Sequence, residues 1–245
     1  MKKLPTIDPK YWILMILATT IGEIVGNLIS RNLGLGYTTG SSLLIGVYAL
    51  AVAGTMYFKA EAHAFYWTLI VTGNIAGTNI ADFIVISPLN LGAAWGSLLV
   101  MGLLSTVLVF WKMSAHGVSL GGATGRTTEA LYWSAILMSS TFGTTSGDFL
   151  TSDTPLGALG GSVLLLGLLC VLVLLTTYTS FPRELAYWSA LVIIHPVGAT
   201  IGNYISKPIG LNFGNVYTSL FLTVAFLALY NIAGSKPSKP AHEPA

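Results

Sequence analysis

Long apolar stretches alternate with short polar connections along the whole chain. An α-helix needs about 20 apolar residues to cross the hydrocarbon core of a bilayer. Read with a window of that length, the pattern predicts eight membrane-spanning helices. The predicted spans are residues 11–30, 38–58, 65–86, 93–112, 131–150, 156–177, 185–206 and 214–232. The pattern therefore predicts an all-α polytopic membrane protein.

The amino-acid composition excludes the main alternatives to a membrane protein. Hydrophobic residues make up 53% of the 245 residues and charged residues only 8%, whereas soluble domains carry about 25% charged residues. The single cysteine, Cys170, excludes a disulfide scaffold, and the net charge of +2 gives no reason to expect nucleic-acid binding. We find no phosphate-binding loop, serine elbow or HExxH pair. We therefore expect neither an enzyme nor a bound cofactor.

The basic residues are distributed unevenly between the two sides of the predicted membrane. Nine of the 11 fall in the tails and in the loops after even-numbered spans, whereas Arg31 and Lys207 fall after odd-numbered spans. Cytoplasmic loops carry an excess of lysine and arginine, so we expect both termini in the cytoplasm. No small-x-small cleavage site precedes Tyr11, so we expect no signal peptide.

An internal repeat organises the chain. A Tyr-Trp doublet opens each odd-numbered span, at residues 11–12, 66–67, 132–133 and 187–188. We expect these rings to anchor the spans at the headgroup level. A glycine follows ten residues after each Trp, and glycine or alanine follows four residues later; the pairs are Gly22 and Gly26, Gly77 and Ala81, Gly143 and Gly147, and Gly198 and Gly202. Such small-xxx-small motifs let helix backbones approach closely.

The spacing predicts four tandem two-helix repeats, residues 11–58, 65–112, 131–178 and 185–232. Each repeat holds two spans, so all four enter the membrane in the same orientation and their pseudo-symmetry axis lies along the membrane normal. Outside the repeats we expect a cytoplasmic tail (1–10), a cytoplasmic loop (113–130) and a disordered cytoplasmic tail (233–245).

Polar residues recur at positions 7, 11 and 15 after each Trp, and we call this set the polar ladder. Residues spaced by four lie on one helix face, so the three rungs stack about 10, 16 and 22 Å along the helix from the Trp. The ladder comprises Thr19, Glu23 and Asn27; Asn74, Thr78 and Asp82; Ser140, Thr144 and Asp148; and His195, Ala199 and Asn203. Only Ala199 is apolar.

Three acidic residues, Glu23, Asp82 and Asp148, fall well inside predicted spans, and we expect no lysine or arginine at that depth to neutralise them. Ionisable side chains in a membrane cost several kcal/mol unless they are paired or hydrated, and they usually mark functional sites. We expect the odd-numbered helices to face one another with the ladder lining a central cavity. The apolar even-numbered helices would form the lipid-facing ring.

The fourfold pattern resembles a family of bacterial membrane-anchored proteins built of tandem repeats of unknown function. The resemblance is clearest at residues 19–23 and 143–148, and it extends from Tyr11 to Asn231. The last position of the family pattern is typically Asp, so Asn27 and Asn203 depart from it and lower the charge of a ring at that level. The resemblance implies a location in the bacterial inner membrane.

The ladder favours a membrane protein that moves a cation, as a transporter or a channel. Carboxylates with hydroxyl, amide and imidazole groups suit a divalent ion such as Mn²⁺ or Mg²⁺, with Glu23, Asp82, Asp148 and His195 as metal ligands. Protons and Na⁺ are alternatives, because the same carboxylates can form a relay. The rival hypothesis is a scaffold or accessory subunit whose ladder only joins helices. We expect the lipid bilayer and the transported ion as partners, and either a monomer or a homo-oligomer.

Overall fold

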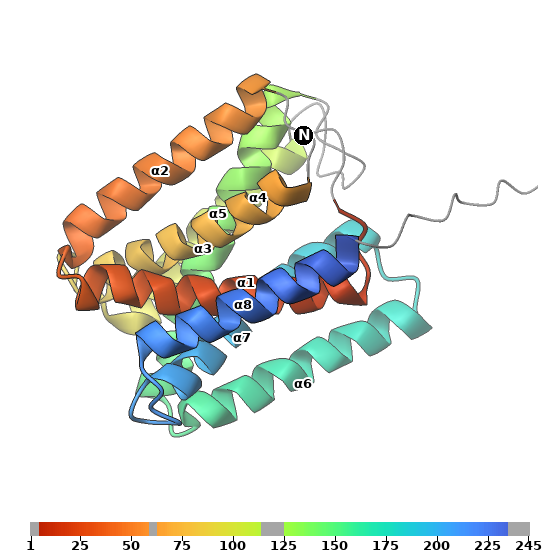
Figure 1. The fold of residues 1–245 in the computed structure, drawn as a ribbon. Coiled ribbons are helices and arrows are strands. Elements are labelled where there is room, and N and C mark those ends of the chain that lie inside the picture. The colour runs from red at the N-terminus through yellow and green to blue at the C-terminus, as the bar shows by residue number, and fades with distance from the viewer. Residues whose placement is uncertain (1–4, 59–62, 114–124, 235–245) are drawn as a thin grey trace, which may run out of the picture.

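The computed structural model describes residues 5–58, 63–113 and 125–234. This part of the chain is all-helical and contains no β-strand (Figure 1). Its α-helices are α1 (Pro9–Asn27), α2 (Gly36–Phe58), α3 (His63–Val85), α4 (Gly92–Met113), α5 (Arg126–Asp148), α6 (Gly157–Tyr178), α7 (Arg183–Ser206) and α8 (Asn215–Gly234). Two π-helical segments, η1 (Leu28–Asn32) and η2 (Phe149–Asp153), continue α1 and α5. The all-helical prediction is confirmed.

Residues 1–4, 114–124 and 235–245, where the sequence predicts cytoplasmic tails and a loop, lie outside the described residues.

Seven of the helices are long and apolar enough to cross a membrane, the first of them running from α1 through η1. The remaining helix, α5, contains many hydroxyl residues between positions 139 and 148. Three of these, Ser139, Thr141 and Thr145, are completely buried. The low hydropathy of α5 follows from its position inside the bundle, where its hydroxyl groups contact protein.

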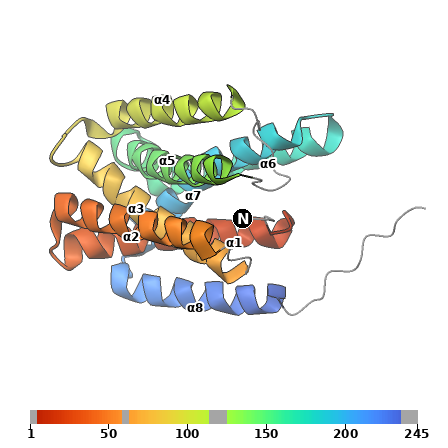
Figure 2. The same ribbon diagram turned by 90° about the horizontal axis from the view of Figure 1, so that it is seen from above.

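The odd-numbered helices form the centre of the bundle. Each packs against two others, in the order α1, α3, α5, α7 and back to α1. The even-numbered helices lie outside them: α2 packs on α3, α4 on α5, α6 on α7 and α8 on α1. In Figure 1, α2 and α6 lie on opposite sides of the central helices, and in Figure 2, α4 and α8 do. We call α1, α3, α5 and α7 the central core.

Burial separates the two sets of helices. In the apolar stretches of α1, α3 and α7, 61–67% of residues are buried, against 22–28% in α2, α4, α6 and α8. The outer helices expose large apolar side chains, such as Leu164 and Val173 on α6. The predicted division into central odd-numbered and peripheral even-numbered helices is confirmed.

Glycines bring the central helices close together. A Cβ added at Gly22 would overlap Asn74, one at Gly77 would overlap Ser140, one at Gly143 would overlap His195, and one at Gly198 would overlap Thr19. Each contact joins a glycine to a first-rung residue of the neighbouring central helix. Only glycine permits this approach, which confirms the role predicted for the first glycine of each motif.

Candidate functional site

Four tyrosine hydroxyl groups close one end of the central core. Tyr11 lies within hydrogen-bond distance of Tyr66 (2.7 Å) and Tyr187 (2.9 Å). Tyr132 completes the cycle, with Tyr66 at 3.1 Å and Tyr187 at 2.8 Å. All four side chains are buried. A hydroxyl can donate one hydrogen bond and accept another, so each tyrosine can serve both of its neighbours. We call this group the tyrosine ring and this end of the core the tyrosine end.

The tryptophans of the doublets support the ring from outside. Each packs against the tyrosine of the adjacent central helix at centroid distances of 5.5–5.9 Å; the pairs are Trp67 with Tyr11, Trp133 with Tyr66, Trp188 with Tyr132 and Trp12 with Tyr187. The doublets thus pack inside the bundle. The prediction that they anchor the helices at the headgroup level is wrong, because the tyrosines bury their hydroxyl groups in contact with one another.

An apolar layer follows the tyrosine ring. Four residues after the tyrosines lie Met15, Ile70, Ile136 and Leu191, and none of the four side chains is exposed. This layer has no polar side-chain group that could continue the hydrogen bonds of the ring. The ring and the apolar layer together separate the tyrosine end from the polar ladder.

The first rung of the ladder bonds mainly within its own helices. Thr19 donates to the Ile16 carbonyl (2.9 Å) and Asn74 to the Ile70 carbonyl (2.8 Å). Ser140 donates across helices to the Asn74 carbonyl (3.4 Å). His195 Nδ1 lies 2.7 Å from the Leu191 carbonyl oxygen. That contact places the proton on Nδ1 and leaves Nε2 as an acceptor, and Nε2 has no hydrogen-bond partner among the described residues.

The second rung is organised around Glu23. Its carboxylate accepts hydrogen bonds from Thr144 (3.0 Å) on α5, Thr78 (3.4 Å) on α3 and Asn27 (2.8 Å) one turn along α1. The two threonine hydroxyls lie 3.1 Å apart. Glu23 is only 2% exposed, and none of these three partners carries a charge. Ala199, the remaining position, packs against Gly147.

The third rung contains two aspartates and two asparagines. Asn203 donates to Asp148 (3.1 Å), linking α7 to α5. Asn27 donates to Glu23, as above, and Asp82 accepts from Arg31 (2.9 Å), linking α3 to η1. The side chains of Asn27, Asp82 and Asn203 are almost fully buried. We call this end of the core the acidic end.

Two basic residues neutralise the aspartates, contrary to the sequence prediction. Arg31 forms an ion pair with Asp82 at 2.9 Å, and Lys207 Nζ lies 3.9 Å from Asp148. The prediction ended the first span at residue 30 and assigned Arg31 to a loop. In the structure, η1 continues the helix through Asn32, so the guanidinium can contact the neighbouring helix. Both basic side chains are partly exposed, at 34% and 26%.

The four predicted metal ligands do not form one centre. No group of three or more His, Cys, Asp or Glu side chains among the described residues is arranged to hold a metal ion. Glu23, Asp82 and Asp148 each have separate partners, and His195 lies on the first rung beside Ser139 (3.2 Å). The ladder residues are brought together as one polar region, but the carboxylates and the imidazole do not converge.

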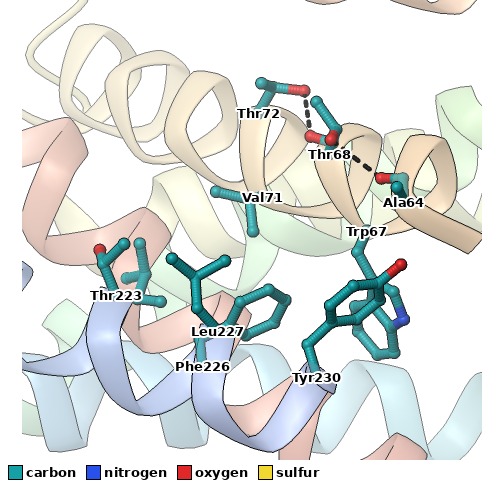
Figure 3. Close-up of a pocket in the computed structure, with 10 residues that line it drawn as sticks. Ala64, Trp67, Thr68, Val71, Thr72, Thr223, Phe226, Leu227 and Tyr230 are labelled. Atoms are coloured by element: carbon teal, nitrogen blue, oxygen red, sulfur yellow. Dashed lines mark hydrogen bonds between the residues drawn. The ribbon is translucent and has the colours of Figure 1, made fainter. Parts of the chain in front are cut away.

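A groove of about 280 Å³ lies outside the central core, between α3 and α8 (Figure 3). Its lining is mostly apolar, with Trp67, Phe226 and Leu227 prominent. The hydroxyls of Thr68 and Thr72 donate to carbonyls of their own helix. The groove therefore offers little polar chemistry, and it is separate from the ladder.

Sequence reasoning missed the tyrosine ring and the two basic residues, although one signal could have found them. Position 19 after Trp continues the spacing of four and falls on Arg31 in the first repeat and Lys207 in the fourth. The tyrosines and the apolar layer extend the same series in the other direction.

Comparisons with known proteins identify the repeat and no more. No curated protein and no solved structure matches the chain. Residues 10–61 and 131–181 each match the family model described as Repeat of Unknown Function (DUF347). These segments correspond to the first and third repeats predicted from the sequence. The chain therefore contains two copies of the Repeat of Unknown Function (DUF347), as its resemblance to a repeat family of unknown function predicts.

Proposed function

We propose that this chain is a membrane transport protein that moves a cation through the central core, with Glu23 as the residue that binds it. The observation that carries the proposal is the environment of Glu23. The carboxylate is almost fully buried between α1, α3 and α5, and its hydrogen-bond partners are two threonines and an asparagine. A buried carboxylate without a cationic partner favours the uptake of a proton or a metal ion.

Charge balance favours a singly charged cation over the divalent metal suggested by the sequence. Asp82 pairs with Arg31, and Asp148 lies near Lys207. With all five groups ionised, the three acids and two bases leave one negative charge. A proton or Na⁺ neutralises that charge, whereas Mn²⁺ or Mg²⁺ leaves an excess positive charge in a low-dielectric site. Thr78, Thr144 and Asn27 offer hydroxyl and amide groups beside the ion.

The layers of the central core support a pathway that is open to only one side of the membrane at a time. The acidic end includes partly exposed charged groups, whereas the tyrosine ring and the apolar layer close the other end. A transported ion would enter from the acidic end, bind at Glu23 and leave after the tyrosine end has opened. The structure then corresponds to the state closed at the tyrosine end.

We further propose four two-helix repeats related by an axis along the membrane normal. In support, the Gly–ladder contacts, the Trp–Tyr contacts and the tyrosine ring all follow the same order around the core. The orientation proposed from the basic residues places both termini in the cytoplasm of a bacterial inner membrane. The tyrosine end then faces the cytoplasm.

The rival function is a non-transporting scaffold. It is favoured by the many ladder side chains that bond their own helix or a neighbouring one, such as Thr19 and Asn74. In a scaffold, Glu23 would be protonated and would serve as a hydrogen-bonding group between helices. Glutamine at this position would then substitute for it well.

Ion flux into proteoliposomes tests the proposal, with H⁺, Na⁺ and Mn²⁺ measured separately for wild type and for Glu23→Gln. We expect Glu23→Gln to abolish flux while retaining the elution profile and thermal stability of wild type, because glutamine has the same shape but cannot carry the charge. Glu184→Gln, at an exposed position on α7, is the control and should transport normally. Equal flux in Glu23→Gln and wild type, or no flux in folded wild type, would favour the scaffold.

A further inference from the structure

Among the described residues, every buried polar atom of the ladder that lacks a hydrogen-bond partner is an acceptor. On the third rung they are Asn27 Oδ1 on α1, Asp82 Oδ2 on α3 and Asn203 Oδ1 on α7. His195 Nε2 is the corresponding atom on the first rung. The three oxygens belong to equivalent positions, 15 residues after the Trp of their respective repeats. Three of the four central helices thus contribute an unsatisfied acceptor at one level.

The orientation of the two amides follows from their carboxylate neighbours. An amide nitrogen and oxygen are distinguished by the hydrogen bonds that they make. Asn27 lies 2.8 Å from a Glu23 oxygen, and Asn203 lies 3.1 Å from an Asp148 oxygen. Of the two ends of an amide, only the NH₂ group can donate to a carboxylate, so both amides turn their oxygen away from it. The surplus of acceptors follows from this chemistry and from the guanidinium bound to the other oxygen of Asp82.

A buried acceptor without a donor destabilises the folded chain, so three of them at one level indicate that a group that would bind them is missing. That group has to carry donors or positive charge. The nearby basic groups, on Arg31 and Lys207, already contact Asp82 and Asp148. A cation bound between the helices would supply that charge. It is limited to a single positive charge, because Glu23, one helical turn away, carries the one negative charge that Arg31 and Lys207 leave unpaired.

We propose that the third rung binds a monovalent cation through the amide oxygens of Asn27 and Asn203 and the free carboxylate oxygen of Asp82. This inference rests on the proposed function. It adds to that function the class of ion and a binding site one helical turn from Glu23. Two ions share the required chemistry. A metal ion such as Na⁺ takes oxygen ligands, and NH₄⁺ donates N–H groups to the same oxygens.

Equilibrium binding to the purified full chain tests the site without relying on transport. Titration calorimetry and the thermal midpoint would be recorded with NaCl, KCl and NH₄Cl, with choline chloride keeping the ionic strength constant. We expect one of these cations to bind and to raise the midpoint in a saturable way. Stabilisation by Na⁺ but not NH₄⁺ would identify a metal-ion site, and the reverse result would identify an ammonium site.

Substitutions at Asn203 separate the site from general stability. Asn203→Leu removes the acceptor and should weaken binding about tenfold or more. Asn203→Asp retains an acceptor but replaces the N–H donor to Asp148 with a second carboxylate. A bound cation then relieves the repulsion between the two carboxylates, so this variant should bind it at least as tightly as wild type. Asn79→Leu is the matched control. Asn79 is equally buried and its Oδ1 also has no partner among the described residues, but it lies outside the ladder, between Gly40 of α2 and the Gly26 carbonyl of α1. This control should leave the affinity unchanged.

The outcomes distinguish the site from the proposed function. If the protein shows no flux but binds a cation, and Asn203→Leu weakens that binding, the third-rung site is retained and the proposal of transport is overturned. The opposite result is flux that requires Glu23, combined either with no cation binding at equilibrium or with equal binding in Asn203→Leu and wild type. That result would overturn the third-rung site and retain transport. Absence of both would overturn the two proposals, with ordered water then satisfying the third-rung oxygens.

Discussion

At the tyrosine end of the central core, four identical hydroxyl groups bond one another in a closed cycle, whereas at the acidic end asparagines, aspartates and basic residues leave buried acceptors unpartnered. Both ends belong to the same four helices and lie on the same series of positions spaced by four. The contrast arises from the side chains alone. A hydroxyl contributes as many hydrogen bonds as it receives in such a cycle, but a carboxylate only accepts.

The difference assigns different roles to the two ends. A closed and satisfied layer resists the entry of water or ions, because any guest has to replace hydrogen bonds already made. A layer with surplus acceptors is stabilised by a bound ion that supplies positive charge. In the proposed transporter, the tyrosine end is the barrier and the acidic end is the binding region, and the close packing of the helices holds both in register.

Loss of that packing should have the largest effect on both ends. In Gly143→Leu the new side chain overlaps the backbone of His195. Because backbone cannot move aside as a flexible side chain can, we expect a loss of about 3 kcal/mol or more in stability, and little folded protein. Expression level and the elution profile in detergent measure this. Gly102→Leu on α4, where an added Cβ meets nothing within 4 Å, should fold as wild type. Equal yields of the two variants would contradict the close packing of α5 and α7.

A polar residue in the apolar layer should abolish the distinction between the two ends. Ile136 is completely buried in this layer, and Ile136→Asn places donors and acceptors between the tyrosine ring and the first rung. We expect a loss of about 1–3 kcal/mol in stability and a passive proton leak in proteoliposomes, because the layer can then hold water. Ile136→Val keeps the layer apolar and should show no proton leak. A folded Ile136→Asn protein without a leak would show that the core is not the pathway.

The architecture could be predicted from the sequence because it depends on periodic features. Apolar length indicated the helices, and the glycines spaced by four indicated which of them pack closely. The positions that the prediction misjudged lie at the ends of the periodic series. Arg31 was assigned to a loop because a hydropathy window ends at the first charge, whereas the π-helical segment η1 continues the helix beyond it. Tyr11 resembled an interfacial anchor because a single Tyr-Trp pair is typical of one.

The pairing of side chains between helices could not be predicted from the sequence, for a different reason. The ladder places Asp82 and Asn203 on equivalent positions, but the partner of each depends on how the helices are arranged around the core. Asp82 pairs with a basic residue of η1, and Asn203 with an acid of α5. Without that arrangement, three buried acids suggested one metal centre. The order of the helices shows two neutralised aspartates and one glutamate with neutral partners.

Removal of one hydroxyl from the tyrosine ring should have the smallest overall effect, because it lowers stability without causing a proton leak. Tyr66→Phe keeps the ring packed but loses the contacts to Tyr11 and Tyr132, and both of those hydroxyls retain Tyr187 as a partner. At about 0.5–1.5 kcal/mol for each net hydrogen bond, we expect a fall of about 2–6 °C in the thermal midpoint for a chain of this size. Tyr217→Phe, at a site that is 76% exposed, should leave the midpoint unchanged.

The same variant tests whether the ring or the apolar layer forms the barrier. With Ile136 intact, the apolar layer still separates the two ends, so Tyr66→Phe should not leak protons although it is less stable. A leak in Tyr66→Phe as large as that of Ile136→Asn would assign the barrier to the hydroxyl cycle itself. An unchanged midpoint would show that the Tyr66 hydroxyl contributes no net stability, so that packing of its aromatic ring is enough at this position.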